Sequence, residues 1–308
     1  MDSAELLRYF RGELFITANG AKLMNDRTDL FQTLDFGDGI LRIQGSGSVF
    51  CYLVRGTERA LLIDTMTGLG NLRLRLNRVT DLPVTVVCTH GHFDHIGGTA
   101  DFPTAWIPRG DAVMLQEQQC SERKYWLENM LCTLRRLPLK FSHEDFTPAH
   151  GVVWRGLCGG KTFDLGGRIV TAVDIPGHTV GSTGYLDSKT GTLFVGDAGS
   201  RSTYLFLHWS RSVEGYLEGL LRLKDRWGAR IKRWFNFHNY TEMPADILDD
   251  LINACRCALH GKITGQKFRG TELFRFVYPV DKKWRRLDGG YGNIIVRLDR
   301  LRIEDEPF

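Results

Sequence analysis

The chain has 308 residues, of which 43% are hydrophobic and 25% are charged. These values are typical of a globular protein with a large buried core, and they exclude a low-complexity or fibrous chain. The formal net charge of +4 is too modest to argue for a nucleic-acid partner.

Strand-like runs punctuated by glycine open the predicted fold and cover residues 30–36, 40–44, 49–55 and 60–64, after a short amphipathic helix and loop within 1–28. Residues 72–79 carry apolar side chains at helical spacing, and the apolar run 84–88 predicts a buried strand. Strand, helix and strand therefore lead directly to Thr89. This order places the next residues at the carboxyl end of a sheet strand, where α/β folds hold their sites.

Three histidines and one carboxylate follow that strand within six residues: His90, His92, Asp94 and His95. A single histidine here could simply be packed in the core. Four such side chains at one strand end have no evident packing purpose, and borderline metals such as zinc prefer imidazole and carboxylate ligands. The sequence therefore predicts a metal site.

The middle of the chain carries fewer strand signals. We expect a short strand at 105–107 and helices at 111–119 and 121–136. Residues 137–160 are irregular and aromatic. We interpret the region of about 120–160 as an insertion over the site and not as part of a sheet.

Strand signals resume in the second half, at 161–165, 168–175, 183–187, 192–195 and 231–235. Helices are predicted at 213–227 and 244–260, and strands at 273–278 and 293–298 form a β-rich tail within about 270–300. Strand runs thus come in two sets, each followed by helices. This pattern predicts two packed sheets with helices outside, in a single domain over 1–308.

Further metal-type residues lie just beyond strands of the second set: His178, Asp197 and His238. Together with the first cluster they make seven ligands, five histidines and two aspartates. Seven are too many for one tetrahedral ion, but they suit two ions that share a carboxylate, with water at the open positions.

Three segments carry a resemblance to a known family. Residues 89–95 (THGHFDH), 176–182 (PGHTVGS) and 196–197 (GD) resemble the motifs of the metallo-β-lactamase-fold hydrolase superfamily, and the resemblance covers roughly residues 30–260. It implies an α/β fold, an αββα sandwich of two mixed β-sheets with helices on the outer faces. It also implies a binuclear metal centre along one edge.

The same resemblance implies roles for the seven ligands. The first ion would be held by His90, His92 and His178, the second by Asp94, His95 and His238, and both by a bridging Asp197. We expect two divalent ions, with zinc as the first choice and iron or manganese as alternatives. The pairing of Asp94-His95 with Asp197 resembles lactonases and thioesterases of the glyoxalase II type. Two features depart from the family: His238 lacks flanking glycines, and a tyrosine expected soon after Asp197 is found only at Tyr204.

The expected chemistry follows from two ions, which hold a hydroxide at neutral pH for attack on a small ester, lactone or thioester carbonyl. Asp94 would orient this hydroxide or accept its proton. His208 and Tyr204 follow Asp197 and are further catalytic candidates, although a packed or surface role fits each of them as well. The substrate is expected to be a small molecule with an apolar or aromatic part.

Other classes of function remain open from the sequence. The same two-metal site could serve a phosphodiesterase or nuclease, and a similar motif set holds one iron in persulfide dioxygenases. A metal-stabilised binding protein is a further alternative. Seven scattered cysteines and the absence of a run of about 18 apolar residues predict a cytoplasmic protein without membrane contact, and a homodimer is left open.

Overall fold

The computed structural model describes residues 30–45, 49–118, 127–128, 141–148, 150–238, 242–244 and 246–307. The chain divides into two compact units. Unit 1 comprises residues 1–108, 112–157 and 163–168, and unit 2 comprises residues 109–111, 158–162 and 169–308. None of the described helices has both the length and the apolar character needed to cross a membrane.

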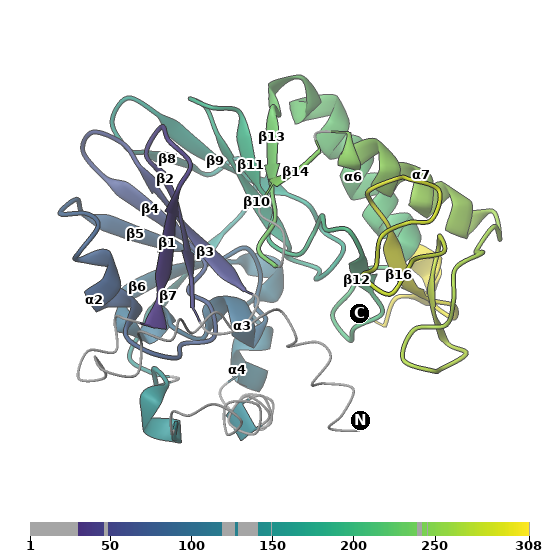
Figure 1. Cartoon of the computed structure of the whole chain (residues 1–308), viewed down its shortest axis with the longest axis horizontal. Coiled ribbons are helices and arrows are strands. Elements are labelled where there is room, and N and C mark those ends of the chain that lie inside the picture. Colours follow the sequence, from purple (N-terminus) through teal and green to yellow (C-terminus); the bar gives the residue numbers. More distant parts are fainter. Residues whose placement is uncertain are drawn as a thin grey trace. The chain divides into compact units, whose positions relative to one another are not determined.

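Unit 1 is built on a seven-stranded sheet whose strands follow their order in the chain (Figure 1). They are β1 (Gln32–Asp35), β2 (Ile40–Gln44), β3 (Phe50–Arg55), β4 (Ala60–Ile63), β5 (Val84–Val87), β6 (Thr104–Pro108) and β7 (Val153–Leu157). Strands β1 to β4 pair antiparallel, whereas β4 to β7 pair parallel. The parallel strands β4 and β5 end at the same edge of the sheet, and the residues after both strands meet there.

The central strands β3 and β4 are buried almost throughout, as expected for strands covered on both faces. All residues of β4 and all but the last residue of β3 are buried. Short helices connect the strands: α2 (Leu72–Leu76), α3 (Phe93–Ile96) and α4 (Met114–Gln118), with 3-10 turns η3 (Thr99–Asp101) and η5 (His143–Asp145). Leu72 and Leu76 of α2 join the core formed with β2 to β5.

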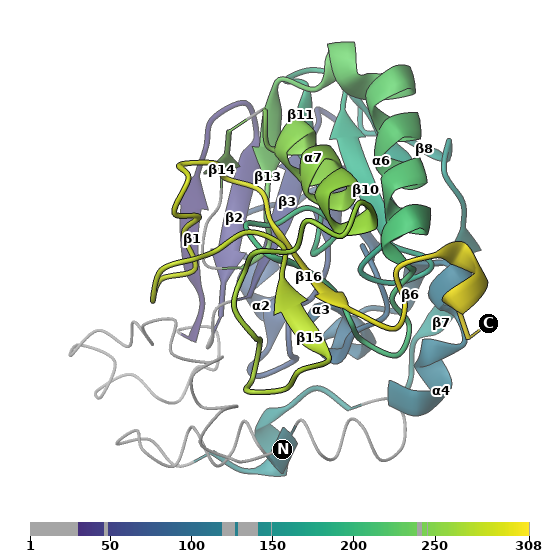
Figure 2. The same ribbon diagram turned by 90° about the vertical axis from the view of Figure 1, so that its right-hand side faces the viewer.

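Unit 2 contains a six-stranded sheet of order β14-β13-β11-β10-β9-β8. Its strands are β8 (Thr162–Asp164), β9 (Ile169–Asp174), β10 (Thr183–Asp187), β11 (Thr192–Phe194), β13 (Arg233–Phe235) and β14 (Glu242–Met243). The pair β11–β13 is parallel, so this sheet is mixed as well. Helices α6 (Val213–Trp227) and α7 (Ile247–Leu259) lie side by side, and their apolar faces bury against residues of β9, β11 and β13 (Figures 1 and 2).

A small third sheet also belongs to unit 2, with the strand order β12-β16-β15. Figure 1 labels β12 beside β16, and Figure 2 labels β16 beside β15. Strand β12 (Thr203–Leu205) runs parallel to β16 (Ile294–Arg297), which pairs antiparallel with β15 (Phe274–Phe276). The C-terminal tail is thereby hydrogen-bonded to the loop region that follows Asp197. Short 3-10 turns complete the unit: η4 (Arg109–Asp111), η6 (Gly228–Arg230) and η7 (Ile303–Asp305).

The predicted class, mixed sheets with helices, is confirmed, and most predicted strands and helices are present within a few residues. One prediction is wrong: residues 137–160 are not free of sheet, because β7 pairs with β6 along its whole length. Strand β7 forms the sheet edge and is mostly exposed, so it lacks the apolar run that marks a buried strand. Two strands of the third sheet, β15 and β16, lie within the predicted runs 273–278 and 293–298, but β12 and its pairing with β16 were not predicted.

Several predictions concern residues or properties that the structure does not describe. The helices predicted within 1–28 and over most of 121–136 lie outside the described residues. The single domain, the cytoplasmic location and the homodimer stay predictions.

Candidate metal centre

A buried carboxylate, Asp64, anchors the histidine cluster of unit 1. It follows β4 directly, in a left-handed conformation with φ of 64°. Its two oxygens accept hydrogen bonds from the Thr89 amide at 2.6 Å, the Thr89 hydroxyl at 2.8 Å and His95 Nδ1 at 2.7 Å. Burial raises the pKa of Asp64, while its interactions with His95 and Thr89 act in the opposite direction. Three donors around two oxygens are the surroundings of an ionised carboxylate.

These hydrogen bonds determine which nitrogen of two histidines carries the hydrogen. His95 donates from Nδ1 to Asp64, so its Nε2 presents a lone pair. The hydroxyl hydrogen of Thr89 already goes to Asp64, so His90 Nδ1 is the donor in the 2.9 Å contact between His90 and Thr89. Both imidazoles are thereby held as metal ligands commonly are, with Nδ1 bound to a neighbour and Nε2 available.

The remaining donors of unit 1 are arranged by the short helix α3. His92 is its N-cap residue in an extended conformation, and Asp94 and His95 lie within the helix itself. The rings of His92 and His95 approach that of His90, with centroid distances of 4.8 and 4.1 Å. Asp94 is half-buried, and its Oδ2 lies 3.9 Å from His95 Nε2. Unit 1 therefore gathers its four predicted ligands at one strand end.

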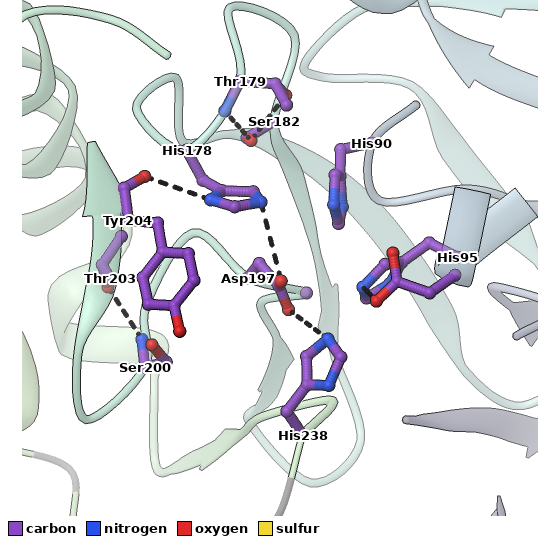
Figure 3. Close-up of polar contacts among 12 residues, drawn as sticks. His90, His95, His178, Thr179, Ser182, Asp197, Ser200, Thr203, Tyr204 and His238 are labelled. Carbon is purple, nitrogen blue, oxygen red and sulfur yellow. Dashed lines mark hydrogen bonds and ion pairs between the residues drawn. The ribbon is translucent and has the colours of Figure 1, made fainter. Parts of the chain in front are cut away.

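His178 begins the corresponding arrangement in unit 2. It follows β9 and is buried. Its Nδ1 donates to the backbone carbonyl of Tyr204 at 3.1 Å, so here too Nε2 presents the lone pair (Figure 3). The hydroxyl of Ser210 donates to the His178 carbonyl at 2.8 Å. Main chain and ring of this residue are both held by the segment that begins at β12.

The turn after His178 is held by a second buried carboxylate, Asp111 in η4. Its oxygens accept from the Thr179 hydroxyl and from the Gly181 amide, each at 2.7 Å. A Cβ on Gly181 would lie 2.6 Å from the Asp111 amide and carboxylate, so the turn requires glycine at this position. Asp111 therefore stabilises the loop that carries His178.

Asp197 lies between two histidines of unit 2. Its Oδ2 is 3.6 Å from His178 Nε2 and its Oδ1 is 3.2 Å from His238 Nε2 (Figure 3). Gly196, with φ of 58°, makes the turn that aims this carboxylate. The buried Asn236 links the two strand ends, because it donates to the Gly196 carbonyl and accepts from the His238 amide. A carboxylate with an imidazole nitrogen facing each oxygen has the form of a bridging ligand.

The two further catalytic candidates have different surroundings. Tyr204 is buried in β12, and its ring packs against Phe206, with 4.9 Å between centroids. Its ring centroid is 6.4 Å from that of His178, but the hydrogen bond to His178 comes from its main chain. His208 is exposed, and its ring lies against Trp209. Catalytic roles for Tyr204 and His208 stay predictions.

The donor set fits divalent metal ions. Imidazoles whose Nδ1 hydrogen is bound to oxygen, together with two half-buried carboxylates, are the ligands that zinc and related ions prefer. All seven predicted ligands lie among the described residues, and each unit brings its own members together. The sequence did not single out three supporting residues, Asp64, Asp111 and Asn236. Two of them, Asp64 and Asn236, share the signal that identified the ligands, a polar residue directly after a strand.

Comparisons with known proteins give consistent matches. Residues 45–231 match the family model of the metallo-beta-lactamase superfamily. The human acyl-coenzyme A thioesterase MBLAC2 is 29% identical over 223 residues, which are 62% of this chain and 75% of that protein. A probable metallo-hydrolase of Mycobacterium tuberculosis is 30% identical over 167 residues, 52% of this chain and 49% of that protein.

A solved structure shows the fold. The metallo-beta-lactamase from Pontibacter korlensis matches with a TM-score of 0.52 and 17% identity, over 73% of this chain and 99% of that one. The fold class predicted from the sequence is therefore confirmed.

Proposed function

This chain belongs to the metallo-β-lactamase superfamily, and we propose that it is a two-metal hydrolase that cleaves a thioester. That it is a hydrolytic enzyme follows from the family and from the named relatives. The observation that carries the two-metal proposal is the carboxylate of Asp197, with a histidine nitrogen facing each of its oxygens. If Asp197 bound a single ion, only one of its oxygens would need to lie near the histidine ligands of that ion.

In this proposal two groups of residues would hold the ions. One ion would be held by His90, His92 and His178, the other by Asp94, His95 and His238, and Asp197 would be the shared ligand. The tautomers of His90, His95 and His178 support the assignment. In each ring Nδ1 carries the hydrogen and donates it to an oxygen, so the lone pair of Nε2 is available to an ion.

The reaction proposed is addition of water to a thioester, which gives a carboxylic acid and a thiol. Two divalent ions, when bound, supply a hydroxide at neutral pH and polarise the substrate carbonyl. Asp94 is the acidic side chain of the first turn of α3 and is half-buried. We assign to it the orientation of the nucleophile and the uptake of the proton that the attacking water gives up.

The choice of thioester among carbonyl substrates rests on the relatives. The human protein that is 29% identical over 223 residues is an acyl-coenzyme A thioesterase. The ligand pattern, with both Asp94-His95 and Asp197, agrees with this choice. A small acyl-thioester is therefore the first substrate to test.

The test measures two quantities, the metal content of the protein and its hydrolysis of acyl-coenzyme A. Hydrolysis is monitored through the free thiol that it releases. The wild-type chain should hold two divalent ions and release thiol. Asp197→Ala should hold at most one ion and turn over at least about 100-fold more slowly, because it removes the proposed shared ligand. The matched control is Asp225→Ala, on the exposed face of α6 in the same unit.

Two results would refute the proposal. One is an Asp197→Ala protein that keeps two ions and full turnover. The other is a wild-type protein that holds a single iron and consumes oxygen in place of hydrolysing thioesters.

A further inference from the structure

The segment from β12 to α6 holds the turn of His178 through its main chain. The Val180 amide donates to the Trp209 carbonyl at 2.9 Å, and the Arg211 amide donates to the Gly177 carbonyl at 2.8 Å. Together with the bonds from Ser210 and to Tyr204, four hydrogen bonds join residues 204–211 to residues 177–180. The orientation of the His178 ring therefore depends on where this loop lies.

A buried arginine from the C-terminal segment fixes that loop. Arg300 is only 4% exposed, and its guanidinium donates to the carbonyls of two successive residues, Leu207 and His208. Burial lowers the pKa of Arg300, but a guanidinium remains charged at neutral pH. Burying a charge is unfavourable unless hydrogen bonds compensate it. An apolar side chain would fill this place without that cost, but it could not hold two carbonyls at once.

The same C-terminal segment holds the far end of the loop. The carboxylate of Glu306 accepts from the Arg211 guanidinium at 2.9 Å, and from the Ser212 amide and hydroxyl at 2.9 and 2.7 Å. The C-terminal segment therefore hydrogen-bonds the loop at two points. Arg300 contacts residues 207–208, and Glu306 contacts residues 211–212. Between these points lies Ser210, which bonds the main chain of His178.

We propose that Arg300 is a positioning residue for the metal centre, acting on His178 through the loop that contains Ser210. The inference rests on the proposed function in so far as His178 is a metal ligand. Arg300 touches neither the ion nor the substrate. Its role is to keep in place the Tyr204 carbonyl, which bonds the His178 ring, and the Ser210 hydroxyl, which bonds the His178 main chain.

The experiment compares Arg300→Met with Arg302→Met. Arg302 is exposed and bonds Glu214 at the start of α6, so its loss removes an arginine of the same segment without touching residues 207–208. Zinc affinity is measured by competition with a chromophoric chelator, and the visible spectrum is recorded after cobalt substitution. Circular dichroism and thermal unfolding of the metal-free proteins report whether each variant folds.

We expect folded Arg300→Met to bind zinc about 10- to 100-fold more weakly than the wild type, the range known for residues that orient ligands. Its cobalt spectrum should change, Arg300→Lys should recover part of the affinity, and Arg302→Met should match the wild type. A general loss of stability would not alter the cobalt spectrum of the folded fraction. Wild-type affinity and spectrum in folded Arg300→Met would overturn the inference.

If Arg300→Met does not fold, Ser210→Ala tests the inference in its place. This variant removes the hydroxyl that bonds the His178 carbonyl and leaves the Arg300 guanidinium intact. Weaker zinc binding and an altered cobalt spectrum in Ser210→Ala support the inference, and unchanged values refute it. A wild-type protein that binds no divalent ion would instead refute the proposed function, and the inference with it. The two failures are therefore distinguishable.

Discussion

Asp64 orients two of the predicted ligands at once, His95 directly and His90 through the hydroxyl of Thr89. Asparagine has nearly the same shape as aspartate, but one oxygen is replaced by an amide group that donates. At least one of the three hydrogen bonds to Asp64 would then face another donor. If the amide group takes the place of Oδ1, the Thr89 amide loses its acceptor. If it takes the place of Oδ2, His95 and the Thr89 hydroxyl lose theirs, and the imidazoles of His95 and His90 would be free to turn or to change their tautomers.

Asp64→Asn should therefore weaken metal binding without altering the ligand set. We expect zinc affinity to fall about 10- to 100-fold, as for other residues that orient ligands. Competition with a chromophoric chelator measures this, and Asp81→Asn, at an exposed position of the same unit, is the matched control. Equal affinity in the two variants would show that Asp64 serves stability alone.

At the level of residues, the sequence indicated candidate ligands but not the residues that orient them. The candidates were identified because histidine and aspartate directly after a strand are unusual. The partners of His95 and His178 lie 31 and 26 positions away along the chain, and one of them is a main-chain carbonyl that any residue type would provide. The main-chain partner leaves no mark in a single sequence, and Asp64 shows only the general signal of a polar residue directly after a strand.

Among the elements, α6 was predicted with its observed bounds because several signals agree. Ser212 caps its first turn through the Gly215 amide, and its apolar residues follow the helical period. The strand β12 has only three residues, too few for the strand period of two to be detected. Elements whose order depends on partners elsewhere, such as β12 on β16, were missed for this reason.

The start of α6 should give the protein a pH-dependent stability through Glu306. Burial alone would raise the pKa of Glu306, but hydrogen bonds from Ser212 and the charge of Arg211 outweigh it and lower the pKa. A carboxylate with a lowered pKa stabilises the fold above its unfolded pKa of about 4.3, and this contribution is lost as the pH falls through the folded pKa.

Glu306→Gln should consequently be less stable than the wild type at pH 7, by about 1–3 kcal/mol. The difference should shrink in acid, below about pH 4, where the wild-type carboxylate also takes up a proton. Urea unfolding at a series of pH values measures it. Glu304→Gln, two positions away and exposed, is the control. A difference that stays constant from pH 7 to pH 3 would contradict this account.

For the whole molecule, the proposed ions would take ligands from two distant segments of the chain, residues 90–95 and residues 178–238. An ion that binds only the folded chain stabilises it in proportion to the logarithm of its concentration, by about 2.7 kcal/mol at 100 times Kd. Removing the ions should therefore lower the temperature of unfolding by several degrees.

Differential scanning fluorimetry with and without EDTA tests this expectation. EDTA already saturated with zinc is the control for effects of the chelator itself. The lowered midpoint should return to its original value when zinc is added in excess. A midpoint that EDTA leaves unchanged, in a protein shown to have lost its metal, would mean that the ions do not link the ligand segments.

The fold class could be predicted for the whole molecule because the ligand motifs and the two sets of strands point to the same architecture. The position of the C-terminal segment around Arg300 could not be predicted in this way. Arg300 contacts carbonyls 92 and 93 positions earlier in the chain, and its neighbours in sequence show no apolar period. Its place in the structure depends on long-range hydrogen bonds that only the folded chain reveals.

The carboxylate of Asp64 also couples the binding of the two proposed ions. Under the proposed assignment, His90 would be a ligand of one ion and His95 of the other. Asp64 bonds His95 directly and His90 through the Thr89 hydroxyl. The first ion to bind therefore restricts the motion of Asp64 and Thr89, and part of the entropy of ordering the second ligand set is already lost. Occupancy of the two positions should rise together, so the singly loaded protein is a sparsely populated species.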